Sequence, residues 1–373
     1  MCCVYMPSIL VERPELLSPD FTPDELLFRE KEVEELSFLF SHRLMRGVVP
    51  THVLITGPSG SGKTATVKHV LSKFRTPGRS AYVIASGSGV KVAFRIASEL
   101  GAPVPQRGIS LEEAWERLCT AVGSDILVVV LDELDKMLVV EPDAPLLYFL
   151  TRRPKTWVIG ISNNHGVLGM VKDERVLSSF NPWRIVFTPY SAQQVKEILA
   201  SRVRSARAKV EEEALSLCST LAVALTGGDM RYALTLLSSA LQLAEKAGAP
   251  AVEVKHVEAA KDEVEKEFVL KSLASMQPVH KLLLLKGVYE RGISSPSSLF
   301  EYANAEARRL GLNEYTFRRL SEFLNSLHVE GWVKILRKGA RGRRGVLWEV
   351  APANEDVGLV VQVVDSLLSQ FLL

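Results

Sequence analysis

Residues 52–64 read HVLITGPSGSGKT, a short apolar run followed by a glycine-rich loop. The run has the length and composition of a buried strand, and the loop matches G-x-x-x-x-G-K-[ST] in full. Glycines let consecutive backbone N–H groups turn toward phosphate oxygens, and a helix that follows adds a favourable dipole. The stretch therefore predicts a phosphate-binding loop. Its eight residues are Gly57, Pro58, Ser59, Gly60, Ser61, Gly62, Lys63 and Thr64.

Two carboxylates farther along the chain indicate which chemistry accompanies this loop. The apolar segment ILVVVLDEL, at 126–134, predicts a third strand, and it contains Asp132 and Glu133. Because open α/β sheets bind ligands at the carboxyl ends of their strands, we expect both side chains beside the loop. Lys63 would then neutralise the β- and γ-phosphates of ATP, and Thr64 and Asp132 would hold Mg²⁺. Glu133 would orient and activate the attacking water.

The fold class follows from the alternation of short β-branched runs with helical periodicity. This alternation extends over residues 1–190 and favours an α/β domain whose parallel sheet is covered on both faces. A helix is expected at 30–44, before the first strand. The other expected strands are 81–85, 157–162 and 184–190, and the helices between the second and third strands are 90–100 and 111–122.

Helical periodicity dominates after Pro189 and predicts two further domains. A helical lid domain at 191–276 would contain helices at 191–208, 211–226, 229–247 and 254–275. A winged-helix domain at 277–373 would contain helices at 279–291, 296–310 and 314–330, a hairpin from WVKIL and GVLWEV, and a closing helix in the last residues. The first domain then ends at residue 190.

The overall composition of the 373 residues is that of a globular chain, with 47% hydrophobic and 24% charged residues. Its four cysteines lack the paired spacing of a zinc site, and no stretch resembles a signal peptide or a membrane span. We therefore expect a cytoplasmic protein with no membrane partner. The formal net charge of +2 alone argues against a uniformly basic nucleic-acid-coating protein.

The basic residues gather near the C-terminus, where 313–350 hold eight Lys or Arg and four Asp or Glu, a net charge of +4. In a winged helix the third helix would be the recognition helix, with Thr316, Arg318 and Arg319 among its exposed residues. Its core stripe would be Phe317, Leu320, Leu324 and Leu327. A solvated basic turn is the plainer interpretation of the hairpin. The hairpin cations expected to contact DNA are Lys334, Arg337, Lys338, Arg341, Arg343 and Arg344.

Asn163 follows the strand WVIGIS, and its amide could reach the attacking water, although Asn in this place is often only a turn former. The order of phosphate loop, DE strand, Asn163 and the helical GGDMRYAL resembles the AAA+ ATPases. More closely, it resembles the archaeal Orc1/Cdc6 replication initiators. The resemblance covers nearly the whole chain and includes FTPDELLFREKEVEEL, ELGAPVPQRGISLEEAWERL, VLDELDKM, VIGISNN, DERVLSSF and FTPYSAQQVKEIL.

The resemblance implies roles that the residues alone do not. Asn163 takes the sensor 1 role, and Arg231 takes the sensor 2 role, reaching from the lid to the nucleotide. Arg29 and Tyr190 fall where the family lines the adenine and ribose side of its pocket. Arg175, three residues before Ser178, is the candidate arginine finger acting in trans. The segment 88–108 resembles the initiator-specific insert that touches duplex DNA.

As a whole, the resemblance implies an ATP-dependent initiator that binds double-stranded origin DNA and helps to recruit the replicative helicase (MCM), beside paralogous initiators. ATP and ADP would act as a switch with slow hydrolysis, and the protein would be associated with the nucleoid. Two other functions share parts of the pattern: a clamp-loader-like ATPase, and a signalling ATPase that uses its winged helix for protein contacts. A basic wing in place of an oligomerising collar favours the initiator over the clamp loader.

Overall fold

The apolar run before Glu133 forms strand β3 (Leu127–Asp132), and each of its residues is buried. Such burial is typical of a strand inside a parallel sheet with helices on both faces. β3 belongs to a five-stranded parallel sheet of order β2-β3-β4-β1-β5, which confirms the expected α/β class. The other strands are β1 (Val53–Thr56), β2 (Arg79–Ile84), β4 (Thr156–Ser162) and β5 (Trp183–Val186).

The structure is a computed structural model in which the chain divides into two units, residues 1–258 and 259–373. No helix among the described residues is both long and apolar enough to cross a membrane. The described residues are 10–74, 78–103, 105, 108–274, 279–329, 332–338, 347–353 and 357–371.

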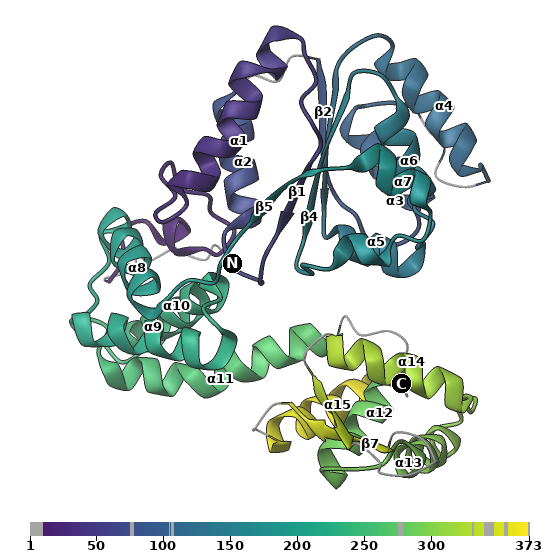
Figure 1. Ribbon diagram of the computed structural model, residues 1–373. Helices are drawn as coiled ribbons and strands as arrows, with labels where there is room; N and C mark the ends of the chain where they lie inside the picture. The colour runs from purple at the N-terminus through teal and green to yellow at the C-terminus, as the bar shows by residue number, and fades with distance from the viewer. Residues whose placement is uncertain are drawn as a thin grey trace, which may run out of the picture. The chain divides into compact units, whose positions relative to one another are not determined.

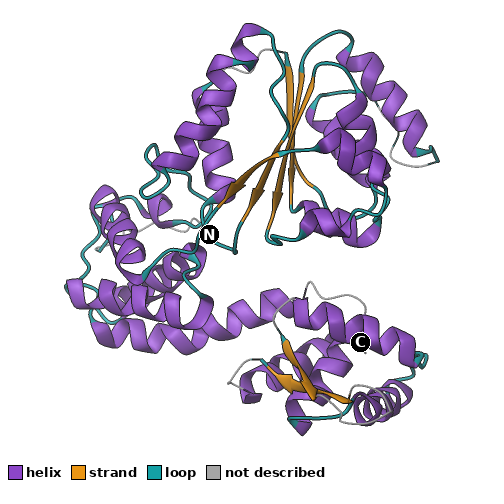
Figure 2. Ribbon diagram, in the orientation of Figure 1, coloured by secondary structure: helices purple, strands orange, loops and turns teal. Residues whose placement is uncertain are grey.

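Helices cover both faces of the sheet, as Figure 1 shows, with α1 and α2 on one face and α3 to α7 on the other. Two separate apolar clusters fill the spaces between sheet and helices. The strands, drawn as orange arrows in Figure 2, end at one edge of the sheet. Asp132 is the last residue of β3 at this edge, and Asn163 directly follows β4. The helices are α1 (Glu30–His42), α2 (Lys63–Lys73), α3 (Gly89–Glu99), α4 (Leu111–Val122), α5 (Leu134–Val140), α6 (Pro145–Arg152) and α7 (Glu174–Phe180).

Part of the expected insert at 88–108 packs against the sheet. Its first half is α3, whose Val92, Ile96 and Ala97 are buried in the core beside the sheet. Residues 104, 106 and 107 lie outside the described part of the chain. The helical half of the insert therefore contributes to the hydrophobic core of the first unit.

The first unit continues into a helical lid, as the periodicity after Pro189 predicts. α8 begins at a capping box, in which the Ser191 hydroxyl accepts from the Gln194 backbone and the Gln194 side chain accepts from the Ser191 backbone. This cap starts the lid one residue after Tyr190, so the end of the sheet domain leads directly into the lid. The helices are α8 (Ala192–Ala206), α9 (Glu212–Thr226), α10 (Met230–Lys246) and α11 (Val254–Ala274), which crosses the boundary between the units.

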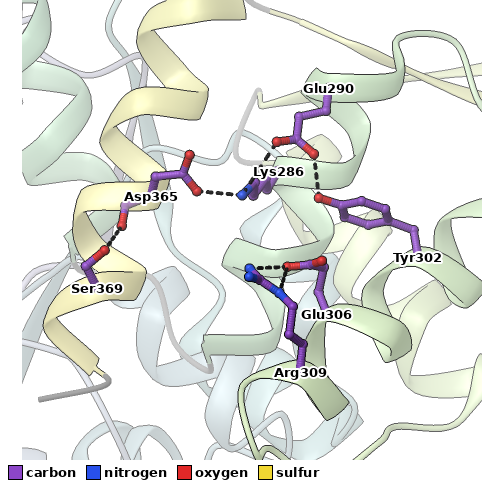
Figure 3. Close-up of polar contacts among 7 residues, drawn as sticks. All are labelled: Lys286, Glu290, Tyr302, Glu306, Arg309, Asp365 and Ser369. Atoms are coloured by element: carbon purple, nitrogen blue, oxygen red, sulfur yellow. Dashed lines mark hydrogen bonds and ion pairs between the residues drawn. The ribbon is translucent and has the colours of Figure 1, made fainter.

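The second unit has the predicted order of three helices, a hairpin and a closing helix, around one apolar cluster. Lys286 of α12 pairs with Asp365 of α15 at 2.6 Å and with Glu290 at 3.5 Å, and Figure 3 draws both contacts. Glu290 in turn accepts a hydrogen bond from Tyr302 of α13 at 2.5 Å, so α12 is joined to both neighbours. The elements are α12 (Val279–Arg291), α13 (Pro296–Arg309), α14 (Phe317–Val329), β6 (Val333–Lys338), β7 (Leu347–Pro352) and α15 (Val357–Phe371).

The prediction that Phe317 belongs to the core stripe of the third helix is wrong. Leu320, Leu324 and Leu327 are fully buried on α14, but Phe317 is 44% exposed. Phe317 is the first residue of the helix, and its ring packs at an angle on Phe300 near the surface of α13. Phe323, 7% exposed, is the phenylalanine of α14 that enters this core. Helical periodicity alone does not predict this exposure of Phe317, because the residue stands at the very start of the helix.

Candidate functional site

A cavity of about 410 Å³ lies over the phosphate loop in the first unit. Its lining comes from the N-terminal segment 19–27, the loop, the ends of β2 and β3, and the lid helices α8 and α10. The sequence-predicted residues that the structure brings together here are Gly60, Ser61, Gly62, Lys63, Thr64, Asp132, Glu133, Asn163, Tyr190 and Arg231.

The loop needs its glycines because other parts of the first unit approach it closely, as Gly60 and Gly62 illustrate. Gly60 has φ +65°, and a Cβ there would lie 1.9 Å from Oδ1 of Asp229 in the lid. Gly62 has φ +94°, and a Cβ there would lie 2.7 Å from the Tyr190 hydroxyl. Ser59 donates a hydrogen bond to Asp229 at 2.7 Å, so the lid segment that precedes Arg231 is fastened to the loop. The sensor 2 candidate is thereby held beside the phosphate site.

Lys63 is the first residue of α2 and is only 6% exposed. Its ammonium group donates to the carbonyl oxygens of Gly57 and Pro58, at 2.8 and 2.7 Å. Burial, and next the charge of Arg231, lower the pKa of Lys63 to about 8, although the nearby carboxylates of Asp132, Asp229 and Asp135 act in the opposite direction. Phosphate oxygens would supply the acceptors and negative charge that keep this amine protonated.

This pKa predicts a pH dependence of nucleotide affinity. Below about pH 8, Lys63 in the free protein already carries its proton, so binding of ATP needs no proton uptake. Above it, the amine must first be protonated, and the affinity should fall by up to about tenfold per pH unit. Calorimetry in buffers of different ionisation enthalpy should therefore show proton uptake on ATP binding at pH 9 and almost none at pH 7. An affinity that stays constant from pH 7 to 9 would contradict the assignment.

Asp132 and Thr64 provide an oxygen-rich corner next to Lys63. The Thr64 hydroxyl donates to Oδ2 of Asp132 at 2.9 Å, and the backbone N–H of Glu133 donates to Oδ1 at 2.9 Å. Hydroxyl and carboxylate oxygens beside a phosphate site are the ligands that Mg²⁺ prefers. The two residues therefore fit the metal for which the sequence predicts them.

The apolar run through residue 134 suggested that Glu133 belongs to the strand, but the strand ends at Asp132. The backbone of Glu133 is left-handed, with φ +59° and ψ +42°, and Glu133 is the residue before α5. This conformation costs a non-glycine residue on the order of 1–3 kcal/mol and turns the side chain into the cavity wall. Its carboxylate pairs with Lys136 at 2.8 Å, and both side chains are partly exposed. Glu133 thus stands beside the nucleotide site in a position where water can reach it.

The structure separates the remaining predicted residues of this unit into two groups. Asn163 lies just after β4 and lines the cavity, as do Tyr190 and Arg231. Arg29 lies behind the loop, where it is 3% exposed and donates to the carbonyl oxygens of Ser61, Phe28 and Thr188. Its guanidinium group also stacks on the Tyr190 ring at 4.0 Å. Arg29 therefore braces the loop from behind, and its expected place on the adenine side stays a prediction.

Arg175 lies on the surface of the first unit, with a side chain that is 77% exposed. It forms a two-pronged ion pair with Asp173, the residue that caps the start of α7, at 2.7 to 3.2 Å. An exposed arginine is available to a neighbouring molecule, and the structure of a single chain leaves its role in trans a prediction.

The predicted DNA-binding residues belong to the second unit. Thr316 precedes α14, and Arg318 and Arg319 lie on its exposed surface with side-chain exposures of 91% and 59%. Both arginines pair with Glu322, at 3.5 and 3.0 Å. Lys334 is exposed on β6, and Arg337 and Lys338 complete that strand. The wing arginines Arg341, Arg343 and Arg344 lie outside the described residues.

Among the polar residues of the cavity that the sequence interpretation missed are Tyr82 and Arg202. The Tyr82 hydroxyl donates to Asp132, and Arg202 of α8 donates to the carbonyl oxygens of Leu16 and Phe21. Neither belongs to a motif, and only the register of β2 with β3 and the docking of the lid bring them to the site.

The comparisons with known proteins agree with this geometry. Residues 49–165 match the AAA domain family, and residues 196–262 match the Cdc6 AAA+ ATPase-type lid domain. An ORC1-type DNA replication protein of Methanothermobacter thermautotrophicus is 36% identical over 362 residues, which are 95% of this chain and 97% of the relative. The solved structure of the Aeropyrum pernix ORC1 protein in complex with DNA is similar with a TM-score of 0.80 and 30% identity, and 98% of each chain is covered.

A second solved protein shares the fold alone. The Aeropyrum pernix ORC2 protein, in complexes with ADPNP and ADP, is similar with a TM-score of 0.62 and 21% identity, and 97% of this chain and 99% of that chain are covered.

The sheet, the phosphate loop and the lid define an AAA+ ATPase. Within that class, the chain belongs to the family of ORC1-type DNA replication proteins. This membership confirms the predicted initiator class and sets aside the clamp-loader and signalling alternatives.

Proposed function

We propose that this chain binds duplex DNA at replication origins through its second unit and that ATP, held in the first unit, switches its state. The observation that carries the proposal is the combination, in one chain of the ORC1 family, of a complete phosphate-binding loop with a winged helix whose third helix exposes Arg318 and Arg319. The relative from Aeropyrum pernix was solved with DNA, which supports the same use of this chain.

On the nucleotide side, Lys63 would bind the β- and γ-phosphates, while Thr64 and Asp132 would hold Mg²⁺. The metal, when bound, would neutralise phosphate charge as it develops during hydrolysis. Glu133 would position the attacking water from the wall of the cavity, and Asn163 would help to orient it. Arg231 would report the presence of the γ-phosphate to the lid, because it follows Asp229, which is hydrogen-bonded to Ser59 of the loop.

The lid contact supplies the physical basis of the switch. A γ-phosphate would attract Arg231 and compete for the loop groups that now hold Asp229, so ATP and ADP would favour different positions of the lid. Hydrolysis would then reset the state. It would be slow in the isolated chain if the site is completed in trans, either by Arg175 of a neighbouring copy or by a paralogous initiator.

On the DNA side, cations of the hairpin would contact phosphates, and α14 would approach the base edges. The paired arrangement of Arg318 and Arg319 with Glu322 would hold the two guanidinium groups ready on the surface of the helix. The insert at 88–108 would add a second contact with the duplex. The expected partners are double-stranded origin DNA, the replicative helicase and paralogous initiators, and the protein would be associated with the nucleoid.

The wing tests the DNA-binding part of this proposal. Each phosphate contact adds about 0.9 to the slope of log affinity against log salt concentration, because binding releases counterions. Replacing Arg341, Arg343 and Arg344 with Ala should therefore reduce that slope by about 2 to 3. Fluorescence anisotropy with a fixed duplex between about 50 and 200 mM salt measures it. A double change at the exposed Arg117 and Arg204, in the first unit, serves as the control. An unchanged slope in the wing variant would show that the wing arginines do not contact the DNA phosphates.

A further inference from the structure

The carboxylate of Asp132 is held by three donors, and one of them belongs to no motif. Two donors come from residues already assigned to the site, the Thr64 hydroxyl and the Glu133 backbone N–H. The third is the hydroxyl of Tyr82, which donates to the same Oδ2 atom that accepts from Thr64. Asp132 is only 9% exposed, so this network fixes most of the hydrogen-bonding capacity of its carboxylate.

The fold explains how Tyr82 reaches Asp132. β2 pairs in parallel with β3, with Ile84 beside Asp132 and Tyr82 beside Val130. Side chains two residues apart in a strand share one face of the sheet, so Tyr82 extends along the sheet toward the carboxylate. The Lys68 ammonium of α2 lies over its ring, 5.3 Å from the centroid. The ring is therefore held between β3 and the helix that begins at the phosphate loop, and it lines the nucleotide cavity.

The hydroxyl of Tyr82 has a single proton, and it donates that proton to Oδ2 of Asp132. The Thr64 oxygen is also an expected metal ligand, whereas the Tyr82 hydroxyl has no expected role as a ligand.

We propose that Tyr82 is a positioning residue for the metal–nucleotide site, which orients the carboxylate of Asp132 toward Mg²⁺. The proposal rests on the proposed binding of nucleotide with Mg²⁺. The torsion that turns a carboxylate about its last bond is soft, so an Asp132 with fewer donors samples more orientations. Partners that orient metal-binding carboxylates commonly contribute about 10- to 100-fold to metal affinity. Tyr82 acts through Asp132 and has no direct part in the chemistry.

The test is a Mg²⁺ titration of nucleotide binding by the full chain, with Tyr82→Phe compared with wild type. A fluorescent ATP analogue is titrated in EDTA and at increasing Mg²⁺. The affinity in EDTA should stay within about twofold, while the Mg²⁺ concentration for half-maximal enhancement should rise about tenfold or more. Tyr302→Phe is the matched control because it removes another tyrosine-to-carboxylate hydrogen bond, to Glu290 in the second unit, as Figure 3 shows. It should leave the Mg²⁺ midpoint unchanged.

A double-mutant cycle separates positioning from a general effect on the fold. If Tyr82 acts through Asp132, Tyr82→Phe should shift the Mg²⁺ midpoint in the wild-type background and hardly at all in an Asp132→Asn background. An unchanged midpoint in Tyr82→Phe would overturn the proposal, and so would an equal loss of affinity in EDTA and in Mg²⁺. Failure of the wild-type chain to bind the analogue at all would instead contradict the proposed nucleotide function.

Discussion

Lys63→Ala is expected to abolish measurable ATP binding, with an affinity at least about 100-fold below that of wild type. The substitution removes a buried cation that would make charge-assisted hydrogen bonds to phosphate, each contributing about 1.5 to 3 kcal/mol. Two such bonds correspond to a loss of at least about two orders of magnitude. Isothermal titration calorimetry of the purified full chain with MgATP measures this directly.

The matched control for Lys63→Ala is Lys73→Ala, at the exposed end of the same helix. It should bind ATP as wild type does. Since Lys63 now donates to Gly57 and Pro58, thermal unfolding without nucleotide should be compared for all three proteins. DNA affinity without nucleotide should change little in either variant. Saturable ATP binding by folded Lys63→Ala, close to the wild-type affinity, would contradict the phosphate-binding role.

Glu133→Gln is expected to keep ATP binding within a few-fold of wild type while turnover falls by about 100-fold or more. The amide has the same shape but cannot accept the proton of the attacking water, and positioned general bases commonly contribute about 10²- to 10⁴-fold. The loss of the ion pair with Lys136 should matter little, because both side chains are partly exposed. Single-turnover release of labelled phosphate, with nucleotide affinity measured in parallel, separates the two effects.

The same change from acid to amide at Glu116, on the exposed face of α4, controls for the altered charge and should leave turnover intact. Equal turnover by Glu133→Gln and wild type would show that another residue positions the water. A variant that lost both binding and turnover would assign Glu133 to the nucleotide-binding structure and would also contradict the proposed role.

Much of the fold follows from local signals in the sequence. The apolar runs before Gly57 and after Asp125 become buried strands because a parallel sheet buries both faces. The lid begins at Ser191, whose side chain caps α8. The errors occur where tertiary packing decides, as at Phe317, which the first turn of α14 leaves at the surface while Phe323 enters the core.

The residues of the site likewise divide into those that local motifs predict and those that only tertiary packing brings together. The sequence motifs identified Lys63, Thr64 and Asp132 because each belongs to a short pattern with a chemical requirement. Arg29 lies in no such pattern, and its packing under the loop depends on carbonyl groups of Ser61 and Thr188, far apart in the chain. Tyr82 reaches Asp132 only through the pairing of β2 with β3. Contacts of this kind depend on three-dimensional register, which no pattern along a single sequence records.

The most direct test of origin recognition is the affinity of the ATP-loaded full chain for two duplexes of equal length and composition. One duplex is taken from a site enriched in genome-wide crosslinking of this protein, and the other is its scrambled sequence. Measured across a salt series, the enriched duplex should bind about 10³-fold more tightly or better, while non-specific binding falls steeply as salt rises. Equal affinities for the two duplexes at every salt concentration would contradict origin recognition by this chain.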